Sequence, residues 1–199
     1  MRNQPTLPFT DAELYDDRWE YLLVASPARN LAFRVREIKE EFYKDYQQKV
    51  AVNTQPHITI ANFRAKEGLE ASLIRLMRQA CNGHPLFVAE LWGFGGFKHS
   101  TLYINVLEHE PFRNLAYDLR GINDLLRRNG CPRAHLVYTP HMTIARGLPY
   151  HIYEEAIEEY ADRRFRDFFV VNELVLLKRR HRQDKCRWLT TLRLAPLLN

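Results

Sequence analysis

Two short stretches of the chain have nearly the same sequence and carry the side chains of acid–base chemistry. Residues 56–60 read Pro-His-Ile-Thr-Ile, and residues 140–144 read Pro-His-Met-Thr-Ile. Histidine titrates near neutral pH, so one imidazole can accept a proton from a nucleophile while a second, charged imidazole donates one to a leaving group. The neighbouring threonine hydroxyls can donate hydrogen bonds where charge develops on a phosphoryl oxygen. Together these groups suit in-line displacement at a phosphodiester.

Each stretch has the alternating pattern of a β-strand, in which residues two apart point to the same face. A single His-x-Thr carries little weight, because a lone histidine in a strand is usually structural. Two copies in matching frames, each after a proline, favour a shared site instead. We expect one face with the polar pairs (His57, Thr59, His141, Thr143) and a buried face with the apolar residues (Ile58, Ile60, Met142, Ile144).

The elements that would position these residues repeat in the two halves of the chain. Each half reads strand, helix, histidine strand, helix, strand, which predicts an internal duplication and an α+β fold class. We expect a single bilobal domain over residues 1–199, with lobes of approximately 18–98 and 99–199 that can exchange strands. Residues 1–17 are predicted to form an irregular N-terminal arm. A pseudo-twofold axis would relate the lobes, each with an antiparallel sheet and outer helices, so that the histidine strands face each other across a central groove.

Hydrophobic periodicity predicts the individual elements. Ser26 is expected to cap a helix that has Pro27 in its first turn. The glycines at positions 93, 95 and 96 are followed by neither a helix nor Lys-Ser/Thr, so they do not match a phosphate-binding loop and are interpreted as a linker between the halves. The buried face of the first helix is predicted to carry Leu31, Val35, Ile38 and Phe42. Further strands are expected at 21–25, 86–92, 101–107, 168–177 and 188–194.

The composition narrows the class of protein. Hydrophobic residues make up 46% and charged residues 27% of the 199 residues, as in an ordinary soluble domain. No apolar run approaches the roughly 18 residues that a membrane span needs, and the first residues do not resemble a secretory signal. The three cysteines are far apart and lack CxxC spacing, which argues against a disulfide framework or a zinc site and fits a reducing cytoplasm. The net charge of +5 allows an anionic partner.

The paired motif resembles that of the 2H phosphoesterase superfamily, and most nearly its bacterial 2′-5′ RNA ligase-like branch, whose members are also described as RNA 2′,3′-cyclic phosphodiesterases. The resemblance covers the chain from about Tyr21 to Leu194. It implies a bilobal fold and a reaction that needs neither metal nor cofactor and opens a 2′,3′-cyclic phosphate to a 2′-phosphate, with a reversible 2′-5′ RNA ligase activity. The implied partner is RNA with a cyclic phosphate end or a small cyclic nucleotide, and a monomer is expected.

The resemblance also assigns roles to the motif residues. His57 and His141 would be the acid–base pair, and Thr59 and Thr143 would hold phosphoryl oxygens. Family precedent favours His141 as the group that activates water and His57 as the group that protonates the leaving oxygen.

Three further residues are candidates for substrate binding by the same resemblance. Arg146 follows the second motif, but strand parity points it away from His141 unless the strand ends or bulges near Gly147. Phe97 and Tyr103 could stack on a base, or could simply belong to the core. The basic turn at 178–182 is interpreted either as a phosphate-binding rim for RNA or as a solvated hairpin tip.

Two other functions use the same set of residues. The site could act on a cyclic phosphate of ADP-ribose or another non-RNA phosphoester, or the chain could be an RNA-binding or nucleotide-binding module without turnover. Binding that survives the loss of either histidine would favour the module. A bell-shaped pH–rate profile that EDTA does not change would favour an enzyme.

Overall fold

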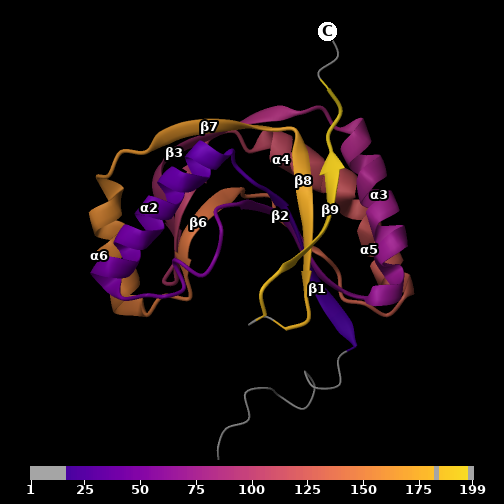
Figure 1. Ribbon diagram of the computed structural model, residues 1–199, viewed down its shortest axis with the longest axis horizontal. Helices are drawn as coiled ribbons and strands as arrows, with labels where there is room; N and C mark the ends of the chain where they lie inside the picture. The colour runs from indigo at the N-terminus through magenta and orange to yellow at the C-terminus, as the bar shows by residue number, and fades with distance from the viewer. Residues whose placement is uncertain (1–16, 182–183, 197–199) are drawn as a thin grey trace, which may run out of the picture.

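The computed structural model describes residues 17–181 and 184–196. The predicted N-terminal arm, residues 1–17, lies outside the described residues except for Asp17. A large antiparallel sheet with helices packed against it confirms the α+β fold class (Figure 1). No helix formed by the described residues is both long and apolar enough to cross a membrane.

The sheet has nine strands in the described part of the chain, in the order β7-β3-β4-β6-β2-β1-β8-β9, with β5 paired to β2. We call β7-β3-β4-β6 the β6 half and β2-β1-β8-β9 the β2 half. Each half combines strands from early and late parts of the sequence. The strands are β1 (Arg18–Ala25), β2 (Ile58–Lys66), β3 (Phe87–Phe97), β4 (Thr101–Val106), β5 (His135–Leu136), β6 (His141–Arg146), β7 (Arg166–Val171), β8 (Glu173–Arg179) and β9 (Arg187–Arg193).

Each half of the sheet is covered by its own helices (Figure 1). Helices α2 (Arg29–Tyr46) and α6 (Tyr150–Ala161) pack on the β6 half. Helices α3 (Glu70–Gly83), α4 (Glu110–Asp118) and α5 (Ile122–Arg128) pack on the β2 half, with short 3₁₀ turns η1 (Glu67–Leu69) and η2 (Leu119–Gly121) beside them. Each long helix buries one stripe at helical spacing, for example Leu73, Met77 and Cys81 of α3.

The predicted single strand at 168–177 is wrong, because the chain breaks at Asn172 into β7 and β8. Asparagine disfavours strands, and here it marks the point where the chain crosses from one half of the sheet to the other, over the top of Figure 1. The residues that follow β9 bind the chain at this end, beside the crossover and the segment that leads into β3. The backbone N–H of Leu194 donates to the carbonyl of Asn172 at 2.9 Å, and that of Leu86 donates to the carbonyl of Ala195 at 2.8 Å. The end of β9 is thereby tied to both halves of the sheet.

Two local predictions are also wrong. Helix α2 begins at Arg29 with Ala28 at its N-cap, so Ser26 does not cap it. Ala28 still has extended backbone (φ −58°, ψ 158°), so the helix starts two residues later than Pro27 would allow. The glycine-rich segment is part of β3 rather than a linker. A Cβ atom on Gly96 would lie 2.5 Å from the hydroxyl of Tyr153 in α6, so the glycine is required by close packing of that helix.

Candidate active site

The two histidine strands are neighbours in the sheet and meet at equivalent positions of the two motifs. Ile58 of β2 pairs antiparallel with Met142 of β6, and both side chains are 0% exposed. Continuing this register places His57 opposite Thr143 and His141 opposite Thr59, all on one face, which we call the histidine face. In such a pair opposite Cβ atoms are about 5 Å apart and diagonal residues about 7–8 Å apart. The two imidazoles therefore flank a space of phosphate size.

Both strands bulge directly after the motif. Ile60 is skipped in the register of β2 with β1, and Ile144 is skipped in the register of β6 with β4. A bulge reverses the parity of the residues that follow it. Arg146 consequently lies opposite Thr101 and returns to the histidine face, as the sequence analysis required for substrate contact. The equivalent bulge in the first motif returns Asn62 to the same face.

Each histidine is held by an equivalent hydrogen bond. Nδ1 of His57 lies 2.7 Å from the carbonyl oxygen of Gln55, and Nδ1 of His141 lies 2.9 Å from that of Thr139. A carbonyl oxygen only accepts, so Nδ1 donates the hydrogen in both rings. Nε2 is left in each ring as the atom that can take up or release a proton. The arrangement fixes the same tautomer twice.

The pKa values of both histidines are lowered. For His57 the main cause is burial, which disfavours the charged ring, and the charges of Lys39, Arg146 and His141 lower the pKa further against the opposing hydrogen bond to Gln55. For His141 the main cause is again burial, with a smaller contribution from His135. Both rings therefore release a proton more readily than a free imidazole.

Two predicted binding residues surround His141. The ring of Phe97 meets it edge-on at 4.7 Å between centroids, and the ring of Tyr103 lies at 5.2 Å. Phe97 and Tyr103 also contact each other at 4.6 Å. The aromatic wall is thus on the β6 side of the site, together with Arg146.

The β2 side is built differently. Asn62 Nδ2 donates to Glu20 at 3.0 Å, and Glu20 also accepts from the buried Arg179 at 2.5 Å. Asn62, the counterpart of Arg146, is therefore held by a neutralised ion pair. The site is one-sided in charge, with Arg146 on its β6 side.

The first two residues of the basic turn at 178–182 are engaged in ion pairs within the protein. The ammonium group of Lys178 is bound by Glu67 and Glu70, and Arg179 is bound by Glu20. Arg180 donates to the backbone carbonyl of Asp17. Arg182, also part of the predicted turn, lies outside the described residues.

Sequence reasoning missed Lys39 and Asn105. Lys39 of α2 is 2% exposed, and its charge reaches His57. The sequence contained a signal for Lys39, because it lies at helical spacing between Val35 and Phe42. The prediction had placed Ile38 in that apolar stripe instead. The buried residues of α2 are Leu31, Val35, Lys39, Phe42 and Tyr46. Asn105 lies opposite His141 in the register of β4 with β6 and became visible only through strand pairing.

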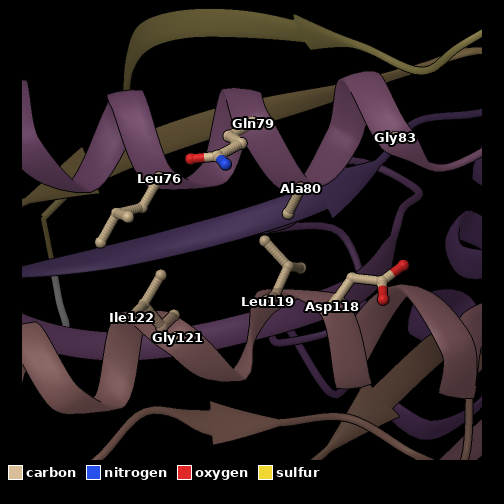
Figure 2. A pocket seen from close by; sticks show the side chains of 8 residues that line it. All are labelled: Leu76, Gln79, Ala80, Gly83, Asp118, Leu119, Gly121 and Ile122. Carbon is tan, nitrogen blue, oxygen red and sulfur yellow. The ribbon is translucent and has the colours of Figure 1, made fainter.

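A cavity elsewhere in the molecule is separate from this site. It has a volume of about 330 Å³ and lies between α3 and the η2–α5 segment, where Leu76 and Ala80 face Leu119 and Ile122 (Figure 2). None of its lining residues belongs to the two motifs. In the ranges 17–181 and 184–196, no three His, Cys, Asp or Glu side chains are close enough together to hold a metal ion.

Comparison with known proteins gives consistent matches along the chain. A family model described as 2′-5′ RNA ligase superfamily matches residues 27–183. A Staphylococcus aureus (strain Newman) protein named "Putative phosphoesterase" is 26% identical over 176 residues, which are 87% of this chain and 98% of that protein.

Solved structures show the same fold. TT0787 of Thermus thermophilus has a TM-score of 0.66 at 18% identity, covering 89% of this chain and 98% of that one. E. coli LigT complexed with 3′-AMP has a TM-score of 0.63 at 17% identity, with the same coverage of both chains. LigT complexed with NADP+ has a TM-score of 0.62 at 19% identity, covering 90% and 99%.

Proposed function

Since the chain belongs to the 2′-5′ RNA ligase superfamily, we propose that it is a phosphoesterase that opens 2′,3′-cyclic phosphates to 2′-phosphates, with His57 and His141 as the acid–base pair. The observation that carries the proposal is the pair of equivalent Nδ1 hydrogen bonds to Gln55 and Thr139. They leave two Nε2 atoms on one face of the sheet, each able to exchange a proton.

The reaction uses one ring as a base and the other as an acid. Neutral His141 takes a proton from water, and the water oxygen forms a bond to phosphorus. The bond from phosphorus to the ribose 3′ oxygen breaks, and charged His57 gives its proton to that oxygen. The products are a 2′-phosphate and a free 3′-hydroxyl. The lowered pKa of His57 suits the donor role, because a more acidic imidazolium releases its proton more readily.

The remaining residues of the histidine face bind the phosphate and the base. The hydroxyls of Thr59 and Thr143 donate to phosphoryl oxygens as negative charge develops on them. Arg146 pairs with the same group from the β6 side. Phe97 and Tyr103 offer ring faces to the base next to the cyclic phosphate, which any base can use.

The proposed substrate is an RNA end or a small nucleotide that carries a cyclic phosphate. With the 5′-hydroxyl of a second RNA in place of water, the same proton transfers would bond that 5′ oxygen to phosphorus as the 3′ oxygen leaves, which forms a 2′-5′ linkage. Two solved neighbours carry nucleotides, 3′-AMP and NADP+, which supports a nucleotide ligand for this fold.

A substrate panel tests the proposal. Purified protein is incubated with nucleoside 2′,3′-cyclic phosphates, with an oligoribonucleotide that ends in a cyclic phosphate, and with ADP-ribose cyclic phosphate, each with and without EDTA. We expect ³¹P NMR to show a 2′-phosphate product at a rate that EDTA does not change. If only the ADP-ribose compound is turned over, the substrate is a non-RNA phosphoester. Tight binding of the oligonucleotide without any product would indicate a binding module.

A further inference from the structure

Lys39 connects the two motifs from beneath. Its ammonium group donates to the hydroxyl of Thr54 at 3.0 Å and to the backbone carbonyl of Thr143 at 3.3 Å. Thr54 stands three residues before His57, in the segment that leads into β2, whereas Thr143 belongs to the second motif. One side chain of α2 therefore fixes the approach to the first histidine against the strand of the second.

The group is a buried cation with neutral partners. Lys39 is 2% exposed, and both its hydrogen-bond acceptors are uncharged oxygens. Among the residues that the structure describes, no carboxylate pairs with it. A buried lysine is normally found only with such a partner, because removing its charge from water is costly. Burial, and then the charge of Arg146, lower its pKa to about 8.

On the β2 side of the seam between β2 and β6, a backbone group bonds the carbonyl of the next motif position, Ile60. There the N–H of Val137 donates to the carbonyl of Ile60, and β5 pairs with β2. On the β6 side a lysine side chain supplies the bond instead. A neutral donor would satisfy the Thr143 carbonyl equally well, so hydrogen bonding does not explain why a charged residue is buried here.

We propose that Lys39 is a positioning residue of the active site, which holds the two motifs in register and places a positive charge beneath the phosphate-binding space. This inference rests on the proposed function, since a bound phosphodiester would supply the negative charge that balances Lys39. The charged groups around His57 are then Lys39 from α2 and Arg146 and His141 from β6. Lys39 adds to the burial that lowers the pKa of His57 until an anionic substrate binds.

The test compares Lys39→Met, which removes the charge and the donor, with Lys39→Gln, which keeps a donor without charge. Lys44→Met, at an exposed position on the same helix, is the matched control. NMR of the imidazole nitrogens follows the titration of both histidines, with no substrate present. We expect the midpoint of His57 to rise by about one pH unit in both Lys39 variants, and that of His141 and the control to stay unchanged.

Binding and turnover complete the test. Inorganic phosphate, followed through the same imidazole signals, should bind about tenfold more weakly to both Lys39 variants, since a nearby charge has been removed. If Lys39→Gln behaves like the wild type, the role is hydrogen bonding alone and the proposal is overturned. An unmoved His57 midpoint overturns it as well. Should the wild type open no cyclic phosphate, the proposed function fails, while the titration still decides the role of Lys39.

Discussion

Ile58 and Met142 occupy the same position in the two motifs and lie directly opposite each other across the seam between β2 and β6. The local twofold axis of the site must therefore pass between them. Each histidine lies opposite the threonine of the other motif. Each half of the site therefore contains residues from both motifs. Both motifs therefore supply a residue that the proposed reaction needs.

His57→Ala and His141→Ala should each lower kcat by on the order of a hundredfold or more, the usual scale for loss of an acid or base. Both rings exchange a proton in the proposed reaction, so neither loss is compensated by the other. His151→Ala, at an exposed position on α6, is the control. Rates are measured on a nucleoside 2′,3′-cyclic phosphate. Wild-type rates in either motif variant would refute the assignment.

The pH dependence should reflect the lowered pKa values of both histidines. For the free enzyme, the profile of kcat/KM is expected to be bell-shaped, with the two apparent pKa values belonging to the pair and centred below about 6.5. Burial lowers both because it disfavours the charged rings. A profile centred well above that value would contradict the effect of burial.

Arg146 and Asn62 offer a comparison between equivalent positions. Arg146→Ala should lower kcat/KM by about tenfold, because a charged hydrogen bond to the phosphate is lost. Asn62→Ala should have a much smaller effect, since Asn62 donates to Glu20 rather than facing the substrate as a charge. Steady-state kinetics of the two variants measure the difference. Equal losses would mean that the one-sided charge of the site has no role in binding.

Gly95→Ala should reduce activity with little loss of stability. The added Cβ would lie 2.6 Å from Oδ1 of Asn105 and 3.1 Å from the ring of Tyr103, both of which are on the histidine face beside His141. Flexible side-chain ends can move away, so the fold tolerates the change while the aromatic wall shifts. Gly121→Ala, which meets nothing within 4 Å, is the control. Thermal unfolding and kcat/KM should separate the two effects.

Lys39 should make stability depend on pH in the alkaline range. Its pKa is about 8 in the folded chain and 10.5 when exposed, so the unfolded state binds more protons between these values. The cost of the buried charge is fully present below about pH 8 and disappears as pH rises through 10.5. Relative to Lys39→Met, the wild type should gain roughly 3 kcal/mol of unfolding free energy over that range. Urea unfolding at about pH 7.5 and about pH 10.5 measures it, and an unchanged difference would mean that folding does not lower the pKa of Lys39.

Much of this architecture was predictable because the sequence repeats itself. Alternation in the two motifs correctly placed Ile58, Ile60, Met142 and Ile144 in the core. The bulges after the motifs were not predictable, since Ile-Ala in both copies looks like any strand and the extra residue shows only in the register. The break at Asn172 was missed for the same reason: residues 168–177 are apolar enough to read as one strand, and only the strand order separates them.

The candidate site was predictable in its residue types and less so in its surroundings. Phe97 and Tyr103 were named from the sequence, and strand pairing brings their rings to His141. Lys39 was overlooked because apolar periodicity assigns a lysine to solvent by default. Arg179 was interpreted as part of a phosphate-binding rim or of a solvated hairpin tip, whereas in the structure it is paired with Glu20.

The interleaved strand order has a consequence for protein synthesis. β1 and β2 leave the ribosome first among the described strands, whereas β8 and β9, which complete their half of the sheet, emerge after all the others. Until then the nascent chain carries β1 with an open edge, which is able to pair with other chains. Assembly of the β2 half therefore waits until β9 has been synthesised.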